Sequence, residues 1–321
     1  MTAIPLSPTA SRDDRPIIIA ALFILVILVA GTAYTWAHFG SAPLLSPTYL
    51  LQQLQIGSFL GIVAAGMMLV ILISQIDLSV PWTLAAAAMM ATAVDGPLAI
   101  PVGLGIGLLV GIVNGIGVAY LRVPSMIFTL GVNAVLRGLM VAHTGGYAPQ
   151  TAATELMRVL AAERTFGIPN ALFVWAGVSL LVVVLLQRTP LGRYIYAIGN
   201  KEAAAYLAGV DTRRVTVICF ALCSLAAALA GVLLAGYSTK AYQAMGDAYL
   251  LPSIAAVVIG GTNILGGRGR YLGTLVGVVL IVLLNSVLSI MDMPEAGRQV
   301  IYGAVIIFML LVYGRGERVT S

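Results

Sequence analysis

The chain has 321 residues, of which 60% are hydrophobic and only 9% are charged, and its net charge is +5. Together with a mean hydropathy of +1.02, these values exclude a soluble globular domain, in which about a quarter of the residues are charged. The basic residues lie beside apolar runs, so they indicate membrane topology and not a nucleic-acid-binding surface. Spans of about 20 residues leave room for roughly ten membrane helices and little else.

Ten apolar segments follow one another along the chain, and we expect each to form a membrane-spanning helix. Their approximate ranges are 17–37, 49–74, 79–94, 97–121, 125–143, 169–187, 214–237, 249–265, 271–291 and 298–313. The chain is therefore predicted to be an all-α membrane protein with one transmembrane domain over residues 1–321. A polar tail, 1–15, precedes the first segment, whose length suits a retained helix better than a cleaved signal peptide.

The basic residues predict the orientation of these spans. With the N-terminus in the cytosol, twelve of the 17 Lys and Arg residues fall on the cytosolic side, four fall outside, and Arg137 lies within a span. This bias follows the positive-inside rule. Both termini, including the tail 314–321, and the loop 188–214 are then cytosolic, and the loop 144–168 is the longest one outside.

Segment 79–94 is barely long enough to cross the hydrocarbon core and carries Pro81 near its start, so we expect it to be broken or tilted. Small residues at every fourth position let a neighbouring helix approach closely. They recur in the fourth and ninth segments: Gly103, Gly107, Gly111, then Asn114, and Gly273, Gly277, then Asn285. These two spans run in opposite directions, so the pattern favours an inverted repeat.

The outer loop carries a mixed-charge stretch, 155–164, that we expect to form a surface helix. Such a helix either receives a partner protein or lies on the membrane, and the sequence does not choose between these roles.

The cytosolic loop 188–214 is the longest charged run between two strongly apolar segments. Within it, residues 200–207 are predicted to form a short helix, with Asn200 as its N-cap, Glu202 in its first turn and Gly209 as its C-terminal stop. A small helix with basic flanks suits contact with a cytosolic protein. The alternative is an ordinary charged loop.

Few polar groups lie in or beside the apolar segments, and they are the candidates for lining a pathway or gate. They are Asp77, Ser79, Asn114, Asn133, Arg137, Thr262, Asn263 and Asn285. A carboxylate near lipid is a functional-site candidate, but Asp77 lies at a predicted helix start, so we favour a capping role for it. Arg137 lies near the outer end of its span, where it can snorkel. No line of acidic groups and histidines crosses the spans, which disfavours a proton-coupled transporter.

The glycine-rich stretch 255–269 is not a phosphate-binding loop, because Gly267 and Arg268 stand where Lys and Ser or Thr would be needed. Cys219 and Cys223 lie four apart in one apolar run, which indicates packing rather than a disulfide or metal site. We therefore expect no cofactor, metal or catalytic site in this chain, so that any ATP-driven activity depends on a partner.

Three stretches in this order and spacing resemble the membrane permeases of bacterial ABC sugar importers of the ribose type. They are I-D-L-S-V at 76–80, the segment 189–200 with Ala203–Ala204 and Ala208–Val210, and the segment 256–269. The resemblance covers residues from about 48 to 313. This chain departs from the family at Pro81–Trp82, where a glycine usually follows the first motif, which puts the local geometry there in doubt.

The resemblance implies an inner-membrane permease that pairs with a second copy or a similar permease to form the translocation pathway. Two cytosolic ATPase subunits would bind ATP and Mg, and a periplasmic sugar-binding protein would deliver a monosaccharide. The coupling helix that docks on the ATPase would consist of Asn200, Lys201, Glu202, Ala203, Ala204, Ala205, Tyr206, Leu207, Ala208 and Gly209.

Two alternatives remain open. A related ABC permease would carry another small polar solute, such as a branched-chain amino acid, a nucleoside or a signalling sugar derivative. A stand-alone secondary transporter or channel would work without ATP and without the coupling helix.

Overall fold

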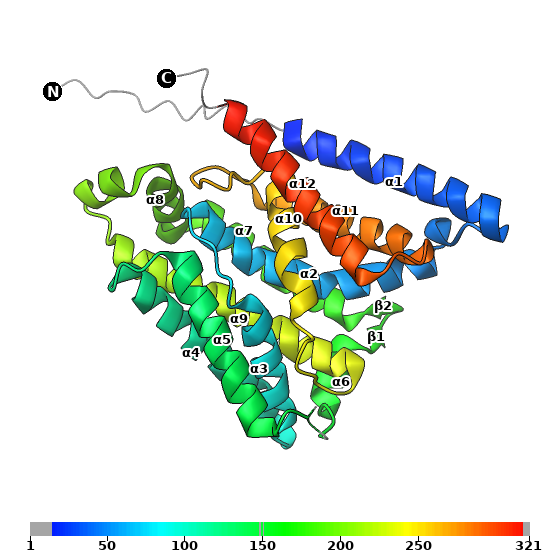
Figure 1. Ribbon diagram of the computed structural model, residues 1–321, viewed down its shortest axis with the longest axis horizontal. Coiled ribbons are helices and arrows are strands. Elements are labelled where there is room, and N and C mark those ends of the chain that lie inside the picture. Colours follow the sequence, from blue (N-terminus) through cyan, green and yellow to red (C-terminus); the bar gives the residue numbers. More distant parts are fainter. Residues whose placement is uncertain (1–14, 148, 150, 317–321) are drawn as a thin grey trace.

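The computed structural model describes residues 15–147, 149 and 151–316, and these are mostly helical (Figure 1). The tail 1–14 and the last residues, 317–321, lie outside this range. The α-helices are α1 Arg15–Phe39, α2 Pro47–Leu72, α3 Val80–Thr92, α4 Ala99–Ala119, α5 Ser125–Thr144, α6 Glu155–Ala161, α7 Asn170–Arg188, α8 Pro190–Leu207, α9 Thr212–Ser238, α10 Leu250–Ile259, α11 Tyr271–Ile290 and α12 Glu295–Gly316. The shorter elements are the 3-10 turns η1 Pro43–Leu45, η2 Gly96–Leu98 and η3 Asp247–Tyr249 and the antiparallel strands β1 Arg164–Thr165 and β2 Ile168–Pro169.

Each of the ten expected apolar segments contains a helix, and seven helices in the described part are long and apolar enough to cross a membrane. The chain is thus an all-α membrane protein. The exceptions include α3 with 13 residues and α10 with 10, which at about 1.5 Å per residue extend only ~20 and ~15 Å. The hydrocarbon core is about 30 Å thick. The expected shortness of 79–94 is confirmed, whereas α10 ends earlier than the expected residue 265, because two glycines follow Ile259 and Gly261 has a φ of 88°.

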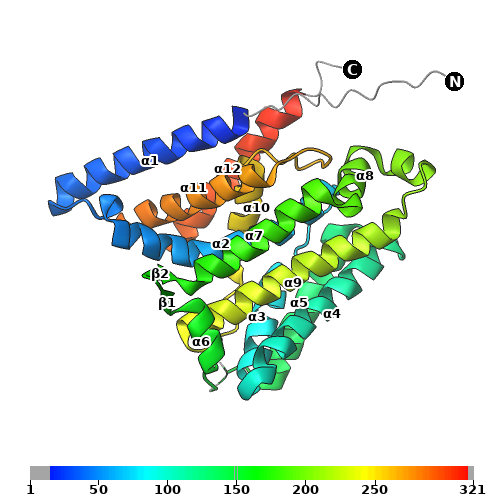
Figure 2. The same cartoon turned by 180° about the vertical axis from the view of Figure 1, so that it is seen from behind.

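Helices α2 and α9 form the centre of the bundle, and α1 lies at its edge against α11 (Figures 1 and 2). Glycines allow the closest helix contacts, as the sequence predicts. On α4, Gly107 and Gly111 face the α9 backbone so closely that neither has room for a Cβ atom. On α11, Gly273 and Gly277 do the same against α10. The two glycine faces therefore pack against different partners.

Two non-helical connections run into the interior from opposite ends of the bundle. One, residues 73–79, joins α2 to α3, and the other, residues 239–249 including η3, joins α9 to α10. The second connection reaches the first turn of α3, just after the first connection ends: Gly246 lies directly against the Pro81 carbonyl, with no room for a Cβ atom. Helices α3 and α10 start beside this point and run away from it in opposite directions (Figure 1). The first turns of both short helices are therefore deep in the bundle.

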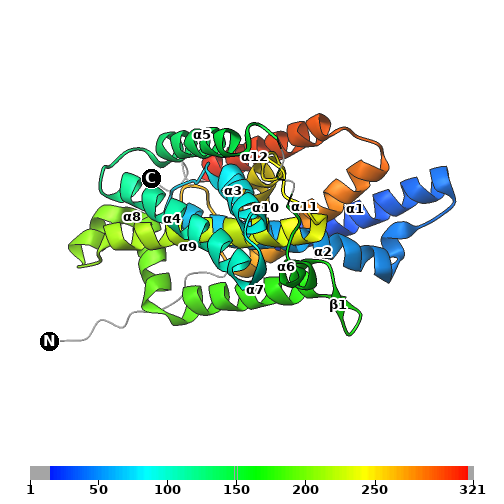
Figure 3. The same cartoon turned by 90° about the horizontal axis from the view of Figure 1, so that it is seen from below.

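The two ends of the bundle differ. The start of α1, the end of α12 and the whole of α8 lie at one end, and α6 with the β1–β2 hairpin lies at the other (Figures 1 and 2). Seen along the other axis, α5 and α12 lie on one face with α3 and α10 between them, and α7 lies on the opposite face (Figure 3).

Candidate functional site

The start of the 73–79 connection is tied to the end of the bundle that carries α8. The Ser74 hydroxyl donates a hydrogen bond of 2.6 Å to the Leu265 carbonyl, and the Gly267 amide donates one of 2.9 Å to the Leu72 carbonyl. Gly199 of α8 packs against the same Leu72 carbonyl with no room for a Cβ atom. Any displacement of α8 therefore bears directly on this connection.

Asp77 is fully buried between α4 and α9. Its Oδ1 atom accepts hydrogen bonds from the Ser79 amide (2.9 Å) and the Ser79 hydroxyl (2.6 Å), and its Oδ2 atom accepts one from Ser224 (3.3 Å). Asn114 donates to the Ser79 hydroxyl at 2.8 Å. The structure thus brings together three of the predicted polar residues, Asp77, Ser79 and Asn114, and adds Ser224 of α9.

The capping role favoured for Asp77 is confirmed in part. Ser79 occupies the N-cap position of α3, but the Asp77 carboxylate accepts the Ser79 backbone amide just before the helix, which is a capping-type contact. The expected position at the boundary is wrong, because the chain continues inward for seven non-helical residues after α2 and Asp77 is fully buried in the bundle. Ser224, its partner near the middle of α9, was not predicted.

A polar stripe on α5 supplies the acceptors for this non-helical backbone. Ser125, Thr129 and Asn133, spaced four apart, accept hydrogen bonds from the backbone amides of Ile76 (3.4 Å), Leu78 (2.9 Å) and Trp82 (3.3 Å). Within a membrane, backbone groups outside helices need such partners. Asn133 was predicted as a pathway candidate, and the Thr129 hydroxyl was recognisable as an intramembrane polar group; Ser125 was not predicted, although the four-residue spacing of these polar side chains was a signal that could have found it.

Arg137 continues the same stripe, one helical turn beyond Asn133. Its guanidinium carbon lies 5.9 Å from the centre of the Trp82 ring, and its charge attracts that of Asp247, the first residue of η3, which precedes α10. Trp82 is buried, but both charged side chains are exposed. Trp82 is one of the two residues at which the chain differs from the sugar-importer motif. Its ring packs under the Arg137 side chain.

The other predicted polar residues lie elsewhere. Asn285 accepts hydrogen bonds from Arg298 (3.1 Å) and Tyr302 (3.2 Å), which joins α11 to α12. Thr262 is buried, and Asn263 accepts a bond of 3.0 Å from the Leu265 amide in the turn after α10. The structure brings none of these three to Asp77.

The expected short helix at 200–207 is the second part of α8. The helix begins earlier than expected, at Pro190, where Thr189 accepts a hydrogen bond of 3.3 Å from the Gly192 amide. Its axis breaks at Lys201, which has non-helical φ and ψ angles. Beyond the break, Tyr206 and Leu207 are 68% and 85% exposed. The segment thus forms a protruding surface of small residues with two large apolar side chains.

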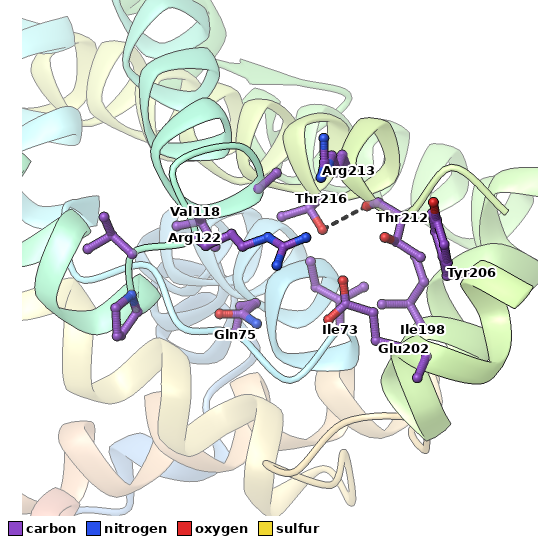
Figure 4. A pocket seen from close by; sticks show the side chains of 14 residues that line it. Ile73, Gln75, Val118, Arg122, Ile198, Glu202, Tyr206, Thr212, Arg213 and Thr216 are labelled. Carbon is purple, nitrogen blue, oxygen red and sulfur yellow. Dashed lines mark hydrogen bonds between the residues drawn. The ribbon is translucent and has the colours of Figure 1, made fainter.

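A cavity of about 590 Å³ opens between this segment and the adjacent ends of α2, α4 and α9. Figure 4 shows Arg122, from the α4–α5 connection, extending into the cavity from one side, while Glu202 and Tyr206 lie on the other. Glu202, Ala203 and Tyr206 therefore face this cavity, whereas Ala205 is buried.

The sequence of residues 49–310 matches the family described as "Branched-chain amino acid transport system / permease component". This match covers most of the chain. The chain belongs to this permease family.

The relatives of the permease carry more specific names. It is 37% identical over 281 residues to the ribose import permease protein RbsC of Escherichia coli (strain K12), covering 84% of this chain and 88% of the relative. It is 36% identical to the ribose import permease protein RbsC of Bacillus subtilis (strain 168), covering 91% and 90%. The autoinducer 2 import system permease protein LsrC of Escherichia coli O9:H4 is 31% identical over 92% of this chain and 86% of its own. No solved structure matches the permease significantly.

At the other end of the permease, the loop 144–168 is only partly as expected. The predicted helix over 155–164 ends at Ala161 and is followed by the β1–β2 hairpin. The α6 helix is anchored, because Gln55 donates a 2.8 Å hydrogen bond to the Ala161 carbonyl and Met157 is fully buried. The helix therefore packs on the bundle, and Phe166 at the hairpin tip, 96% exposed, projects from it.

Proposed function

We propose that two copies of the permease, or one copy and a similar permease, form the pathway of an ATP-driven importer for a monosaccharide of the ribose type. The observation that carries the proposal is the 37% identity to a ribose import permease over 84% of the chain. A periplasmic binding protein delivers the sugar, and two cytosolic ATPase subunits bind ATP and Mg and drive transport across the bacterial inner membrane.

The proposed topology has ten spans, with both termini and α8 in the cytosol. It is supported by the common end at which α8, the start of α1 and the end of α12 lie (Figure 2) and by the concentration of basic residues there. An inverted repeat is supported by the two short helices, α3 and α10, which start at the same depth and run in opposite directions.

The exposed part of α8, residues 200–209, is the proposed coupling helix. The side chains of Ala203 and Ala204 are small and exposed, so an ATPase surface can approach the backbone, while Tyr206 and Leu207 serve as anchors. Movement of this helix reaches the interior through Gly199 and the 73–79 connection. Rocking of the spans against one another then alternates access to the pathway.

A second candidate substrate is a signalling sugar derivative. It is favoured by the 31% identity to an autoinducer 2 import permease. The higher identity to ribose import permeases ranks the ribose-type sugar first.

ATP hydrolysis in proteoliposomes tests the proposed function. The permease is reconstituted with its ATPase, with and without a sugar-loaded binding protein, as wild type and as Ala204→Glu/Tyr206→Glu. Loaded binding protein is expected to stimulate hydrolysis several-fold in the wild type and not in the variant, because the added charges prevent docking. The matched control, Ala204→Ser/Tyr206→Phe, retains stimulation. Uptake of sugar by the permease alone, with no effect of the charged variant, would contradict the proposal.

A further inference from the structure

Two charged side chains, Arg137 and Asp247, lie exposed at a depth where the surrounding surface would otherwise meet lipid. Arg137 is on α5 about 10 Å from the outer end of that helix, at ~1.5 Å per residue. Its guanidinium lies over Trp82, in the first turn of α3, a helix that starts deep in the bundle. The guanidinium therefore lies over the first turn of α3 and is not extended toward the nearby end of α5.

Asp247 reaches the same depth from the other half of the chain. It follows Gly246, which packs directly against the Pro81 carbonyl beside Trp82, and its carboxylate interacts with the Arg137 charge. The two charges thus flank the point at which the second connection reaches the first turn of α3. Both side chains are exposed in the single chain.

An exposed pair of charged side chains such as Arg137 and Asp247 is unfavourable on a protein surface that faces the lipid tails. Ionisable groups within membrane segments face a bundle interior or a water-filled cavity, because transfer of a charge into hydrocarbon is unfavourable. Both faces expose apolar side chains, such as Val135 and Leu139 on α5 and Leu180 and Leu181 on α7 (Figure 3). They differ in charge: the α5 face carries Arg137 and Asp247, whereas α7 has no charged residue before Arg188 at its end, which suits lipid.

We propose that the face carrying α5 and the start of α10 lines the water-filled sugar pathway, and that Arg137 and Asp247 contact the passing sugar. A guanidinium only donates hydrogen bonds and a carboxylate only accepts them. Together they match the hydroxyl groups of a neutral sugar, which do both. This inference rests on the proposed importer function and assigns its pathway to one face and two residues.

Thiol labelling tests which face is wet. The native cysteines, Cys219 and Cys223, are buried, so an introduced cysteine provides the reactive thiol. Ala134→Cys on α5 and Ala248→Cys beside Asp247 are compared with Ala176→Cys on α7; all three alanines are exposed. A small, charged thiol reagent requires a thiolate in water. We expect at least tenfold faster labelling at positions 134 and 248 than at 176 in the complete importer, and slower labelling when sugar-loaded binding protein and ATP are present.

Equal labelling at the three positions, or an unreactive thiol at both 134 and 248, would overturn the proposal, because the face would then lie against lipid or dry protein. The labelling pattern does not depend on sugar uptake, so it is separable from the proposed function. If wild-type importer fails to take up sugar with ATP, the function fails whatever the labelling shows.

Two bulky substitutions, one on each face, test the assignment independently by their effect on sugar uptake. Gly138 and Gly177 are both exposed helical glycines with open space around them, on α5 and α7 respectively. Gly138→Trp is expected to lower the uptake rate at least tenfold without lowering the amount of assembled importer, whereas Gly177→Trp leaves uptake within twofold. Equal uptake by the two variants would contradict the assignment of the pathway to α5.

Discussion

The permease has two polar regions near the meeting point of its half-length helices, and they are built differently. Around Asp77, every carboxylate oxygen has a protein donor, and the carboxylate is fully buried. Around Arg137 and Asp247, both charged side chains are exposed. In the first region the carboxylate is fully paired, although the buried Asn114 Oδ1 atom has no hydrogen-bond partner, and these contacts hold the 73–79 connection in place. The second region has exposed hydrogen-bond donors and acceptors that can bind the passing sugar.

This difference predicts that Asp77 is required for folding and that Arg137 and Asp247 are required for transport. Variants of the two regions, with stability and uptake measured separately, therefore test whether the regions have these different roles.

The largest effect is expected from Asp77→Ala. The substitution leaves Ser79 and Ser224 without their acceptor in a buried site, and such losses cost about 1–3 kcal/mol per unsatisfied group. We expect a stability loss of about 3 kcal/mol and a strongly reduced yield of folded permease, measured by thermal unfolding in detergent. Asp77→Asn, which keeps one acceptor oxygen, is expected to lose less. A stable Asp77→Ala permease with impaired uptake would instead assign Asp77 to the pathway.

A functional effect without a stability effect is expected from Arg137→Ala and Asp247→Ala. Each should lower the sugar uptake rate about tenfold, which corresponds to about 1.4 kcal/mol in the barrier, while thermal unfolding changes by less than about 0.5 kcal/mol because both side chains are exposed. The double variant should be no worse than about twice the poorer single variant if both residues contact the same sugar. Fully multiplicative losses would show that the two side chains act independently.

The α5 stripe connects the two regions, and Thr129→Val tests its structural part. The substitution removes the acceptor of the Leu78 amide, so we expect a stability loss of about 1–2 kcal/mol. Uptake per folded molecule should remain within about twofold, because Thr129 is buried and does not reach the exposed face. Retention of stability together with lost uptake would place the pathway deeper than Arg137.

Sequence reasoning located all ten apolar segments and the motif residues, because apolar composition and the order of motifs are local properties of the chain. How deep a residue lies in the bundle, by contrast, depends on the tertiary structure. Asp77 was expected at the boundary because nothing in the sequence measures how far residues 73–79 run into the bundle. Its contact with Ser224 joins residues 147 positions apart. The true start of α8 was missed but could have been predicted from the sequence, because Thr189–Pro190 is a typical N-cap residue followed by proline at the first helical position.

The smallest effect is expected from Asn285→Ala, which tests whether the similarity between Asn114 and Asn285 extends to function. Asn114 belongs to the Asp77 cluster, but Asn285 only joins α11 to Arg298 and Tyr302 of α12. Loss of these partly exposed hydrogen bonds should cost about 1 kcal/mol and leave uptake unchanged. Asn114→Ala, at the corresponding place in the other half, should cost more because Asn114 is fully buried. Equal losses of stability in Asn114→Ala and Asn285→Ala would mean that the polar contacts of the two inverted halves are equally important. The structural role proposed for the Asp77 region would then not be specific to it.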